Sequence, residues 1–268
     1  MLFEDLSLSK SIQKAVYEEG YTHPTPIQEQ AIPLVLSGRD VIGCAQTGTG
    51  KTAAFAIPII HQLHRIVGSS KKAKEIRALI VTPTRELAVQ IGQNFDTYAK
   101  YTNLTQITLF GGVSQIPQVD TLKKGVDVVI ATPGRLLDLH KQGFINFDHL
   151  HTLVLDEADQ MLDMGFINDV KKIVKLTPKN RQTLLFSATM PIAIRELAEM
   201  FLTDPAKVEV SPVSSTAEKV EQRIYFVEKT EKRNLLYHLI KNENLSDVLV
   251  FSRTKHGADN VVKALRKN

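Results

Sequence analysis

The sequence has little of what disulfide-bonded, zinc-binding or membrane-spanning proteins need. Cys44 is its only cysteine, which excludes an internal disulfide and a cysteine-rich zinc site. None of the eight histidines occurs in the H-E-x-x-H spacing of zinc peptidases. No apolar run reaches the length that spans a bilayer, and no segment is typical of a signal peptide. We therefore expect a protein of the reducing cytoplasm with no membrane partner.

Aromatic side chains are also scarce, at 6% of the chain, and neither sign of charge is in large excess. The 33 Lys and Arg against 29 Asp and Glu permit a polyanionic partner but do not by themselves indicate one. The chain does have length and aliphatic residues, since 43% of its 268 residues are hydrophobic. That is enough to bury the core of one large α/β domain, or of one domain and a fraction.

Apolar, β-branched runs alternate with stretches of helical periodicity along most of the chain. This alternation predicts an α/β fold with a doubly wound, mainly parallel sheet, helices on both faces and ligands at the carboxyl ends of the strands. The predicted strands are Val41–Cys44, Ala78–Val81, Ile107–Phe110, Val126–Ile130, Thr152–Leu155 and Thr183–Phe186. The predicted helices are Ile27–Leu36, Ala53–Val67, Leu87–Tyr101, Arg135–His140, Val170–Val174 and Ile194–Phe201.

A glycine-rich string follows the first predicted strand and begins a predicted helix, which is the setting of a phosphate-binding loop. Glycines let its backbone amides converge, and with the helix N-terminus they form a concavity for phosphate oxygens. Lys51 adds a charge, and the Thr52 hydroxyl can ligate magnesium. Ala45 stands where the strict pattern has glycine, which leaves open a turn that only caps a helix. The string is Ala45, Gln46, Thr47, Gly48, Thr49, Gly50, Lys51 and Thr52.

An acidic string, Asp156-Glu157-Ala158-Asp159, directly follows the predicted strand Thr152–Leu155. A carboxylate at this position holds the metal ion of a bound nucleotide, so Asp156 is a candidate magnesium ligand and Glu157 can orient the attacking water. The alternative is an acidic turn that starts a helix, since carboxylates favour helix N-termini. Together with the phosphate loop, the string favours a nucleoside triphosphate site in which Lys51, Asp156 and Glu157 are catalytic.

The alternating pattern ends near Asp204-Pro205, and Val210–Thr216 is typical of a linker. We therefore expect an ATP-binding domain over residues 1–208, a linker over 209–219 and the start of a second domain over 220–268. Two strands and two helices are predicted in that last part, too few to close a second sheet. They are Gln222–Val227, Arg233–Ile240, Val248–Phe251 and Lys255–Asn268.

The two nucleotide motifs, Ala45–Thr52 and Asp156–Asp159, make the chain resemble the DEAD-box ATP-dependent RNA helicases. The resemblance covers the whole amino-terminal RecA-like domain and the start of a second one, and the chain is similar to the bacterial branch of the family often called RhlE-like. It implies ATP and Mg²⁺ as ligands and hydrolysis coupled to local RNA duplex separation. It also implies that RNA, single-stranded or duplex, is bound regardless of base sequence, and it implies nothing about protein partners.

The segment Gly20–Gln28 matches the adenine-recognition motif of the same family. The resemblance implies that Gln28 reads the adenine edge, where an amide can donate and accept side by side. Tyr21 and Pro26 belong to this motif. Phe3 lies where the family places an aromatic residue that stacks near the base. Without the motif, Gln28 would be interpreted as a polar residue on a surface helix.

Further strings each follow a predicted strand, and the resemblance assigns them to the RNA backbone. Arg85 and Arg135 supply charge, and the glycines allow close approach to phosphates, which suits salt-sensitive, sequence-independent binding. Taken alone, the last of these strings would be an ordinary turn and helix start. A string after Thr183–Phe186 resembles the motif that couples hydrolysis to strand separation, through hydrogen bonds with Asp159. The RNA residues are Pro83, Thr84, Arg85, Gly111, Gly112, Thr132, Pro133, Gly134 and Arg135, and the coupling residues are Ser187, Ala188 and Thr189.

The segment Val248–Thr254 is similar to the first motif of the family's second domain, but no later residues match the motifs that carry an arginine finger. That arginine is worth about a thousandfold or more in the rate of phosphoryl transfer in related enzymes. We therefore expect a fragment that binds ATP, binds RNA more weakly than a complete protein would, and separates duplexes poorly or not at all.

Two other classes of function remain open from the sequence. One is a nucleotide-dependent RNA-binding module without turnover. The other is a superfamily-2 DNA helicase, which would share Lys51 and the acidic string but not the motif around Gln28. A phosphate-loop kinase is disfavoured because no lid or acceptor-binding segment is apparent. The basic stretch Ser69–Lys74 is interpreted as a solvated loop.

Overall fold

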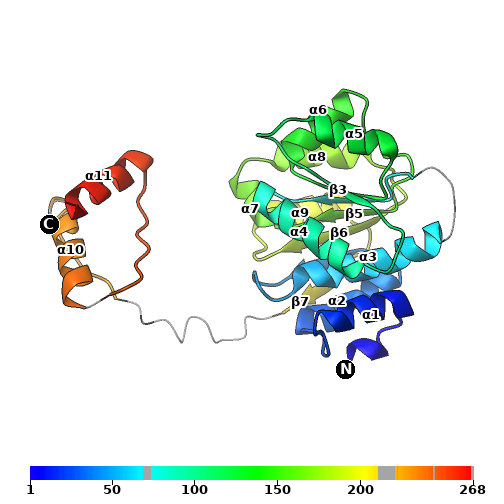
Figure 1. The fold of residues 1–268 in the computed structure, drawn as a ribbon, viewed down its shortest axis with the longest axis horizontal. Coiled ribbons are helices and arrows are strands. Elements are labelled where there is room, and N and C mark those ends of the chain that lie inside the picture. The colour runs from blue at the N-terminus through cyan, green and yellow to red at the C-terminus, as the bar shows by residue number, and fades with distance from the viewer. Residues whose placement is uncertain (69–73, 211–220, 222, 244, 267–268) are drawn as a thin grey trace. The chain divides into compact units, whose positions relative to one another are not determined.

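The described residues of the first unit, Met1–Pro212, contain one seven-stranded sheet in the order β3-β4-β2-β5-β6-β1-β7 (Figure 1). Every pairing in this sheet is parallel, which confirms the predicted α/β class. The structure is a computed structural model and describes residues 1–68, 74–210, 221, 223–243 and 245–266. The strands are β1 (Val41–Cys44), β2 (Ala78–Val81), β3 (Gln106–Leu109), β4 (Val128–Ala131), β5 (Thr152–Leu155), β6 (Gln182–Ser187) and β7 (Ala206–Glu209).

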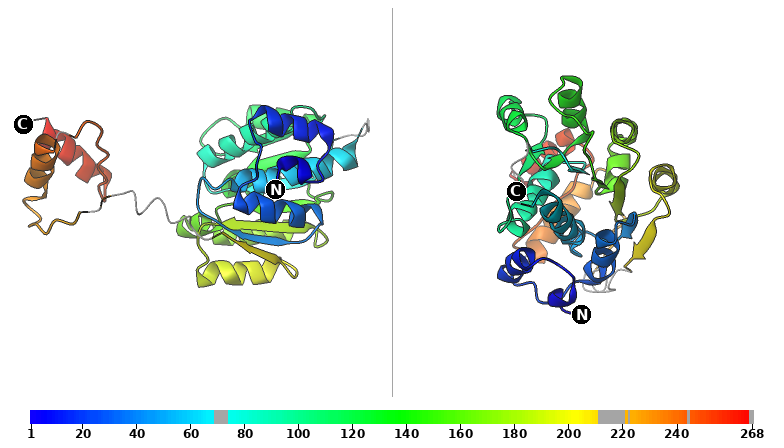
Figure 2. Two further views of the ribbon diagram at one scale, coloured as in Figure 1. Left: turned by 90° about the horizontal axis from the view of Figure 1, so that it is seen from below. Right: turned by 90° about the vertical axis from the view of Figure 1, so that its right-hand side faces the viewer.

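Successive strand residues point to opposite sides of the sheet, and the residues on both sides are apolar and buried. On β2, Ala78 and Ile80 belong to one apolar cluster and Leu79 and Val81 to another. Figures 1 and 2 show helices on both sides of the sheet. The first cluster is covered by α1 (Lys10–Glu18), α2 (Pro26–Leu36), α3 (Lys51–Val67) and α4 (Arg85–Tyr98). The second is covered by α5 (Ile116–Lys124), α6 (Pro133–Lys141), α7 (Ala158–Asp163), α8 (Ile167–Leu176) and α9 (Ile192–Phe201).

All the strands expected in this unit are present, with small shifts at their ends, but one strand and several helices were not predicted. The strand β7 pairs with β1 although the sequence pattern ended just before it. Only Val208 of its residues is buried, so its own sequence gives little strand signal. The helices α1, α5 and α7 and the short 3₁₀ turn η1 (Phe3–Asp5) were not predicted either. The helix expected to reach Tyr101 ends at Tyr98, where the chain turns back through Thr102 N and Ala99 O.

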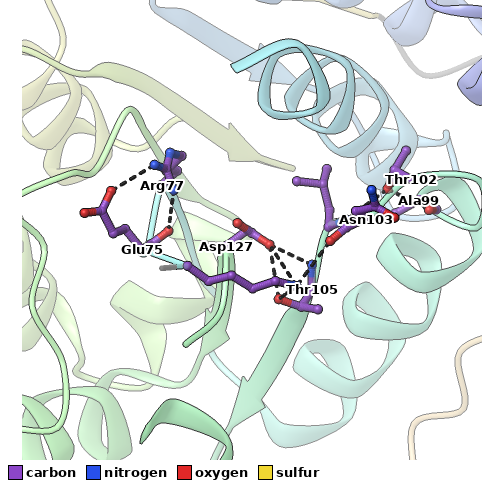
Figure 3. A network of polar contacts seen from close by, with 9 residues as sticks. Glu75, Arg77, Ala99, Thr102, Asn103, Thr105 and Asp127 are labelled. Atoms are coloured by element: carbon purple, nitrogen blue, oxygen red, sulfur yellow. Dashed lines mark hydrogen bonds and ion pairs between the residues drawn. The ribbon is translucent and has the colours of Figure 1, made fainter. Parts of the chain in front are cut away.

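A polar network around Asp127 fixes the amino-terminal edge of the sheet (Figure 3). Asp127 Oδ2 accepts hydrogen bonds from the backbone N and the hydroxyl of Thr105, at 2.9 and 3.1 Å, and lies 3.7 Å from Lys74 Nζ. Lys74 also donates to Thr105 Oγ1 at 3.0 Å and to Asn103 O at 3.2 Å. Lys74 is thus tied to the start of β3 although 34% of its side chain is exposed, and the interpretation of Ser69–Lys74 as a solvated loop stays a prediction, since residues 69–73 lie outside the described residues.

The second unit, Val213–Asn268, contains α10 (Lys232–Asn242) and α11 (Lys255–Leu265), where helices were expected. The two predicted strands are wrong, because residues 223–227 and 248–251 form no strand, and Gln222 lies outside the described residues. A strand needs a neighbour for its backbone groups, whereas Phe226 is 98% exposed. Most of the expected linker also lies outside the described residues, so the domain boundaries stay a prediction. Among the residues that are described, no helix is long and apolar enough to cross a membrane.

Candidate nucleotide and RNA site

The phosphate loop, the acidic string, the coupling string and the three RNA-assigned strings all lie at the carboxyl ends of parallel strands, so they share one edge of the sheet, whereas the Gly20–Gln28 motif precedes β1 and runs into α2. The phosphate loop follows β1, the acidic string follows β5, and the coupling string ends β6, which lies between them. The three RNA-assigned loops follow β2, β4 and β3, which are neighbours in the other half of the sheet. The strand order therefore gathers the predicted nucleotide loops in one half of the edge and the RNA-assigned loops in the other, with β5 beside β2 at the boundary, and we call these the nucleotide half and the RNA half.

The phosphate loop turns on two glycines with positive φ, +84° at Gly48 and +92° at Gly50. Gly50 is the N-cap of α3, so the first amides of that helix face the inside of the loop. Lys51, the first residue of α3, is 7% exposed, and its Nζ has no hydrogen-bond partner within the described structure. A buried ammonium without a partner is costly, and the phosphates of a bound nucleotide would satisfy it.

Gln28 lies against the phosphate loop rather than on the surface of α2. Its side chain is 3% exposed, its Nε2 donates to Gly50 O at 3.1 Å, and its Oε1 accepts from Thr25 N at 2.9 Å. This second bond belongs to a capping box that begins α2, whose first residue is Pro26. Both ends of the amide are thus engaged with the protein. To read an adenine edge, Gln28 must exchange these bonds for bonds to the base.

Phe3 and Tyr21 form an aromatic pair with ring centroids 5.8 Å apart. Tyr21 in turn contacts Tyr98 of α4, and the two hydroxyl groups are 3.1 Å apart. Phe3 is 5% exposed, and its backbone N donates to Thr22 O at 3.1 Å, which holds the N-terminal segment beside the Gly20–Gln28 motif. A cavity of about 440 Å³ borders this pair, with apolar walls from η1 and α1. The stacking role of Phe3 stays a prediction.

Asp156 and Glu157 differ sharply in environment although they are adjacent. Burial raises the pKa of Asp156 to about 7, against an opposing effect of the Lys51 charge. Asp156 is 4% exposed, and its Oδ1 has no partner among the described residues. Glu157 is half-buried at the N-cap of α7, and its φ of +51° is uncommon for a residue other than glycine. Such backbone strain is found where a fold holds a functional side chain in place.

These residues fit a nucleotide with a magnesium ion. Two buried polar groups, Lys51 Nζ and Asp156 Oδ1, lack hydrogen-bond partners among the described residues, and they lie at the ends of the non-adjacent strands β1 and β5. An anion beside Lys51 and a cation beside Asp156 would satisfy both, and the half-buried Thr52 supplies a hydroxyl oxygen for the same ion. No group of three or more His, Cys, Asp and Glu side chains among the described residues could hold a metal by itself. A magnesium ion here would therefore depend on phosphate oxygens as well as on the protein.

The expected link between the acidic string and the coupling string is present. Asp159 Oδ2 accepts from both the backbone N and the hydroxyl of Thr189, each at 2.8 Å. Ser187 Oγ accepts from Asp159 N at 3.2 Å and donates to Thr189 O at 2.8 Å. Burial alone would raise the pKa of Asp159, but the hydrogen bonds from Thr189 and Ser187 hold it below its usual range. The string that includes Ala188 is therefore fastened to α7 through an ionised carboxylate.

The two arginines of the RNA half contact the same loop, residues 110–114 after β3. The Arg85 guanidinium lies 4.7 Å from the centre of the Phe110 ring, and Arg135 Nη2 donates to Val113 O at 3.0 Å. Arg135 Nη1 is buried without a partner in the described structure. Arg85 follows Thr84, which caps α4 by accepting from Leu87 N at 3.3 Å. Both cations therefore reach the loop that contains Gly111 and Gly112.

Helix starts supply further amides in this half. Thr132 is the N-cap of α6, Pro133 is its first residue, and the exposed Gly134 leaves the helix N-terminus accessible. Pro83 is buried at the end of β2. Sequence reasoning missed Gln118, which is 8% exposed and bonds the 110–114 loop from α5. Its sequence position gave no signal, because α5 itself was not predicted.

A parallel sheet with a phosphate loop at its carboxyl edge defines the chain as a nucleotide-binding α/β protein of the RecA-like class. The family described as "DEAD/DEAH box helicase" matches residues 25–197. The chain belongs to this family, as its motifs predicted.

Bacterial relatives support the assignment. The chain is 46% identical to the "DEAD-box ATP-dependent RNA helicase RhpA" of Helicobacter pylori over 96% of this chain and 51% of that protein. It is 43% identical to "ATP-dependent RNA helicase RhlB" of Pseudomonas aeruginosa, over 99% of this chain and 68% of the relative. A crystal structure of a DEAD box protein from Methanococcus jannaschii matches all of this chain and 70% of its own, with a TM-score of 0.73 at 37% identity. The chain spans about half the length of RhpA, and the bacterial branch it belongs to stays a prediction.

Proposed function

We propose that this chain is the ATP- and RNA-binding part of an ATP-dependent RNA helicase. The observation that supports it best is the division of one sheet edge, with nucleotide loops after β1, β5 and β6 and RNA-assigned loops after β2, β3 and β4. A substrate in the first half and a nucleic acid strand in the second would lie on adjoining loops. Hydrolysis could then be sensed where the strand is bound.

In the nucleotide half, the phosphate loop and Lys51 bind the phosphates of ATP. Thr52 and Asp156 would hold a magnesium ion, whose charge would offset the negative charge of the phosphates. Glu157 orients the attacking water and accepts its proton. Gln28 senses the base, and Phe3 stacks near it. The buried, partnerless Lys51 Nζ and Asp156 Oδ1 support this assignment.

In the RNA half, Arg85 and Arg135 face phosphates, and backbone amides near Gly111, Gly112 and Gly134 approach them closely. Contacts of this kind carry no base code, so RNA of any sequence is the expected ligand. Binding should weaken steeply with salt, because each neutralised phosphate releases counterions.

The Asp159–Thr189 hydrogen bonds suit a coupling role, because they join the acidic string to the loop after β6. The resemblance implies that the longer relatives have two RecA-like domains, and that ATP and RNA favour a closed arrangement of these domains over an open one. We assign duplex separation to that arrangement. The 268-residue chain itself is expected to bind ATP, to bind RNA with weakened affinity, and to separate duplexes poorly or not at all.

The first experiment measures ATP turnover by the chain with and without single-stranded RNA, beside ADP and ATP binding. Tight nucleotide binding with slow turnover is the expected result, and Glu157→Gln should bind ATP but abolish the remaining turnover. Failure to bind nucleotide, or turnover that Glu157→Gln leaves unchanged, would overturn the assignment.

A strand-separation assay on matched RNA and DNA duplexes completes the test. No release is expected from either duplex at saturating ATP. Release of DNA alone would favour the DNA helicase alternative, whereas complete absence of turnover with RNA binding intact would favour the non-hydrolytic module. The cytoplasm remains the proposed compartment, since the chain has a single cysteine and thus no internal disulfide.

A further inference from the structure

The 110–114 loop is closed at its base by the side chain of Gln118. The Gln118 Nε2 donates to Phe110 O at 3.3 Å and to Ser114 O at 3.4 Å, so one amide group ties together the two ends of the loop. Between these ends, Gly112 has a φ of +79°, a conformation that favours glycine. The loop residues 111–114 are all exposed, whereas Gln118 is 8% exposed. The buried amide is thus the anchor of an otherwise solvent-facing loop.

The same loop is the common support of the RNA-half arginines. Arg135 donates to Val113 O at 3.0 Å, and the Arg85 guanidinium lies 4.7 Å from the Phe110 ring centre. Next along the chain, Gln115 exchanges hydrogen bonds with Gln142 at 3.1 and 3.2 Å, which joins the loop to the end of α6. A shift of the loop would therefore displace both cations and the Gly111–Gly112 amides together.

Burying the polar side chain of Gln118 costs free energy, and packing alone does not explain why a polar residue occupies this position. Its Oε1 is buried and has no partner in the described structure, which an apolar side chain of similar size would avoid. Leu122, which lies one turn further along the same face of α5, is buried, so a leucine or methionine at position 118 would suit that face. The side-chain amide of Gln118 is therefore better explained by its two hydrogen bonds to the 110–114 loop, which hold that loop in one geometry.

We propose that Gln118 is a positioning residue for RNA binding: its amide fixes the 110–114 loop so that Arg85, Arg135 and the Gly111–Gly112 backbone meet the phosphates together. This inference rests on the proposed RNA-binding function. Gln118 touches no nucleic acid itself. Its effect is preorganisation, which lowers the ordering cost that a loose loop would incur on binding.

The test compares Gln118→Met with Gln106→Met, a matched control on β3. Gln106 donates its amide to Asp96 and lies at the opposite end of that strand. Affinity for a short fluorescent oligouridine is measured across salt concentrations, beside ADP affinity and thermal unfolding. Gln118→Met should weaken RNA binding by about five- to tenfold, as expected for one lost hydrogen-bonded anchor, and leave ADP affinity unchanged. Gln106→Met should bind RNA like the wild type.

The salt dependence separates positioning from general damage. If phosphate contacts are lost, the slope of log affinity against log salt should become shallower by about 0.7 for each lost contact with single-stranded RNA. A destabilised fold would lower the unfolding temperature without changing that slope. Gln118→Glu should show the same losses of affinity and slope, because its carboxylate cannot donate to the carbonyls of Phe110 and Ser114. It replaces the methionine variant in the test if that variant does not fold. Faster hydrogen exchange over residues 110–115 is expected in either variant.

An unchanged affinity and slope in Gln118→Met or Gln118→Glu, while Arg135→Met weakens binding, would overturn this inference and leave the proposed function standing. If the wild type does not bind the oligouridine, or if Arg135→Met binds it as the wild type does, the proposed RNA site is wrong and the role of Gln118 with it.

Discussion

Gly50 is the residue at which the phosphate loop and the Gln28 side chain come closest, and it provides a sharp test of the site. A Cβ at this position would overlap Gln28 Nε2 and lie 3.1 Å from Thr25 Oγ1, and φ is +92°. Gly50→Ala should therefore both strain the backbone and push the Gln28 amide away from Gly50 O. Gly38 offers the matched control, because its φ is +80° but nothing lies within 4 Å of an added Cβ.

The two effects can be separated in magnitude. Placing alanine in the left-handed region costs about 1–2 kcal/mol, and this is all that Gly38→Ala should lose. Gly50→Ala should lose in addition about 0.5–1.5 kcal/mol for each Gln28 hydrogen bond, one to Gly50 O and one from Thr25 N, or about 2–5 kcal/mol in all. For a unit of this size, the unfolding temperature should fall by about 2–8 °C in Gly38→Ala and by about 4–20 °C in Gly50→Ala.

Thermal and urea unfolding measure these losses, and ADP binding reports on the loop itself. Gly50→Ala should weaken ADP binding, and Gly38→Ala should not. In a Gln28→Ala background the extra cost of Gly50→Ala should disappear, since the side chain it displaces is already absent. The reasoning fails if the two glycine variants unfold within about 0.5 kcal/mol of each other, or if Gly50→Ala binds ADP like the wild type.

Two further predictions concern groups outside the phosphate loop. Burial lowers the pKa of His61, whose Nδ1 accepts a hydrogen bond from Ser9 N at 3.0 Å, so at mildly acidic pH the unfolded chain binds a proton at His61 that the folded chain does not. The contribution of His61 to stability should therefore be fully present above about pH 6.5 and be lost as the pH drops below it. In unfolding temperatures measured from pH 8 to 5, His61→Gln should flatten this fall. Asp127→Leu should cost about 2–4 kcal/mol in urea unfolding, because leucine can accept neither of the two hydrogen bonds that Thr105 donates to the fully buried Asp127 carboxylate. Lys74→Met should cost about 1 kcal/mol or less, since the Lys74 side chain is 34% exposed. Equal losses would contradict the assignment.

The parts of the fold that could be predicted from sequence are those with strong local patterns. Strands such as Ala78–Val81 are buried on both faces and read as continuous apolar runs, and the structure has them at the same residues. The edge strand β7 has one buried residue, and its pairing with β1 is a long-range interaction, so no local pattern indicated it. The failed strands of the second unit show the converse, because a β-rich segment forms a strand only when a neighbour pairs with it.

The candidate site divides in the same way. The glycines and Lys51 of the phosphate loop, and the acidic string, are local motifs whose chemistry depends on a few consecutive residues, and their positions after β1 and β5 followed from that. The bond from Gln28 to Gly50 joins residues from separate elements, and nothing in either segment specifies it. Gln118 is a similar case, because its partners Phe110 and Ser114 acquire meaning only once the loop is folded.

The sequence by itself determined the family, the parallel α/β class and the residue types proposed to meet phosphate, because these depend on short-range periodicity and on motifs with fixed spacing. Only the tertiary structure decided the strand order, which gathers the proposed nucleotide loops in one half of a sheet edge and the proposed RNA loops in the other. It also decided which polar groups are left buried without partners, Lys51 Nζ and Asp156 Oδ1 among them. The physical reason is that burial and pairing are properties of distant segments packed together, which no single segment encodes.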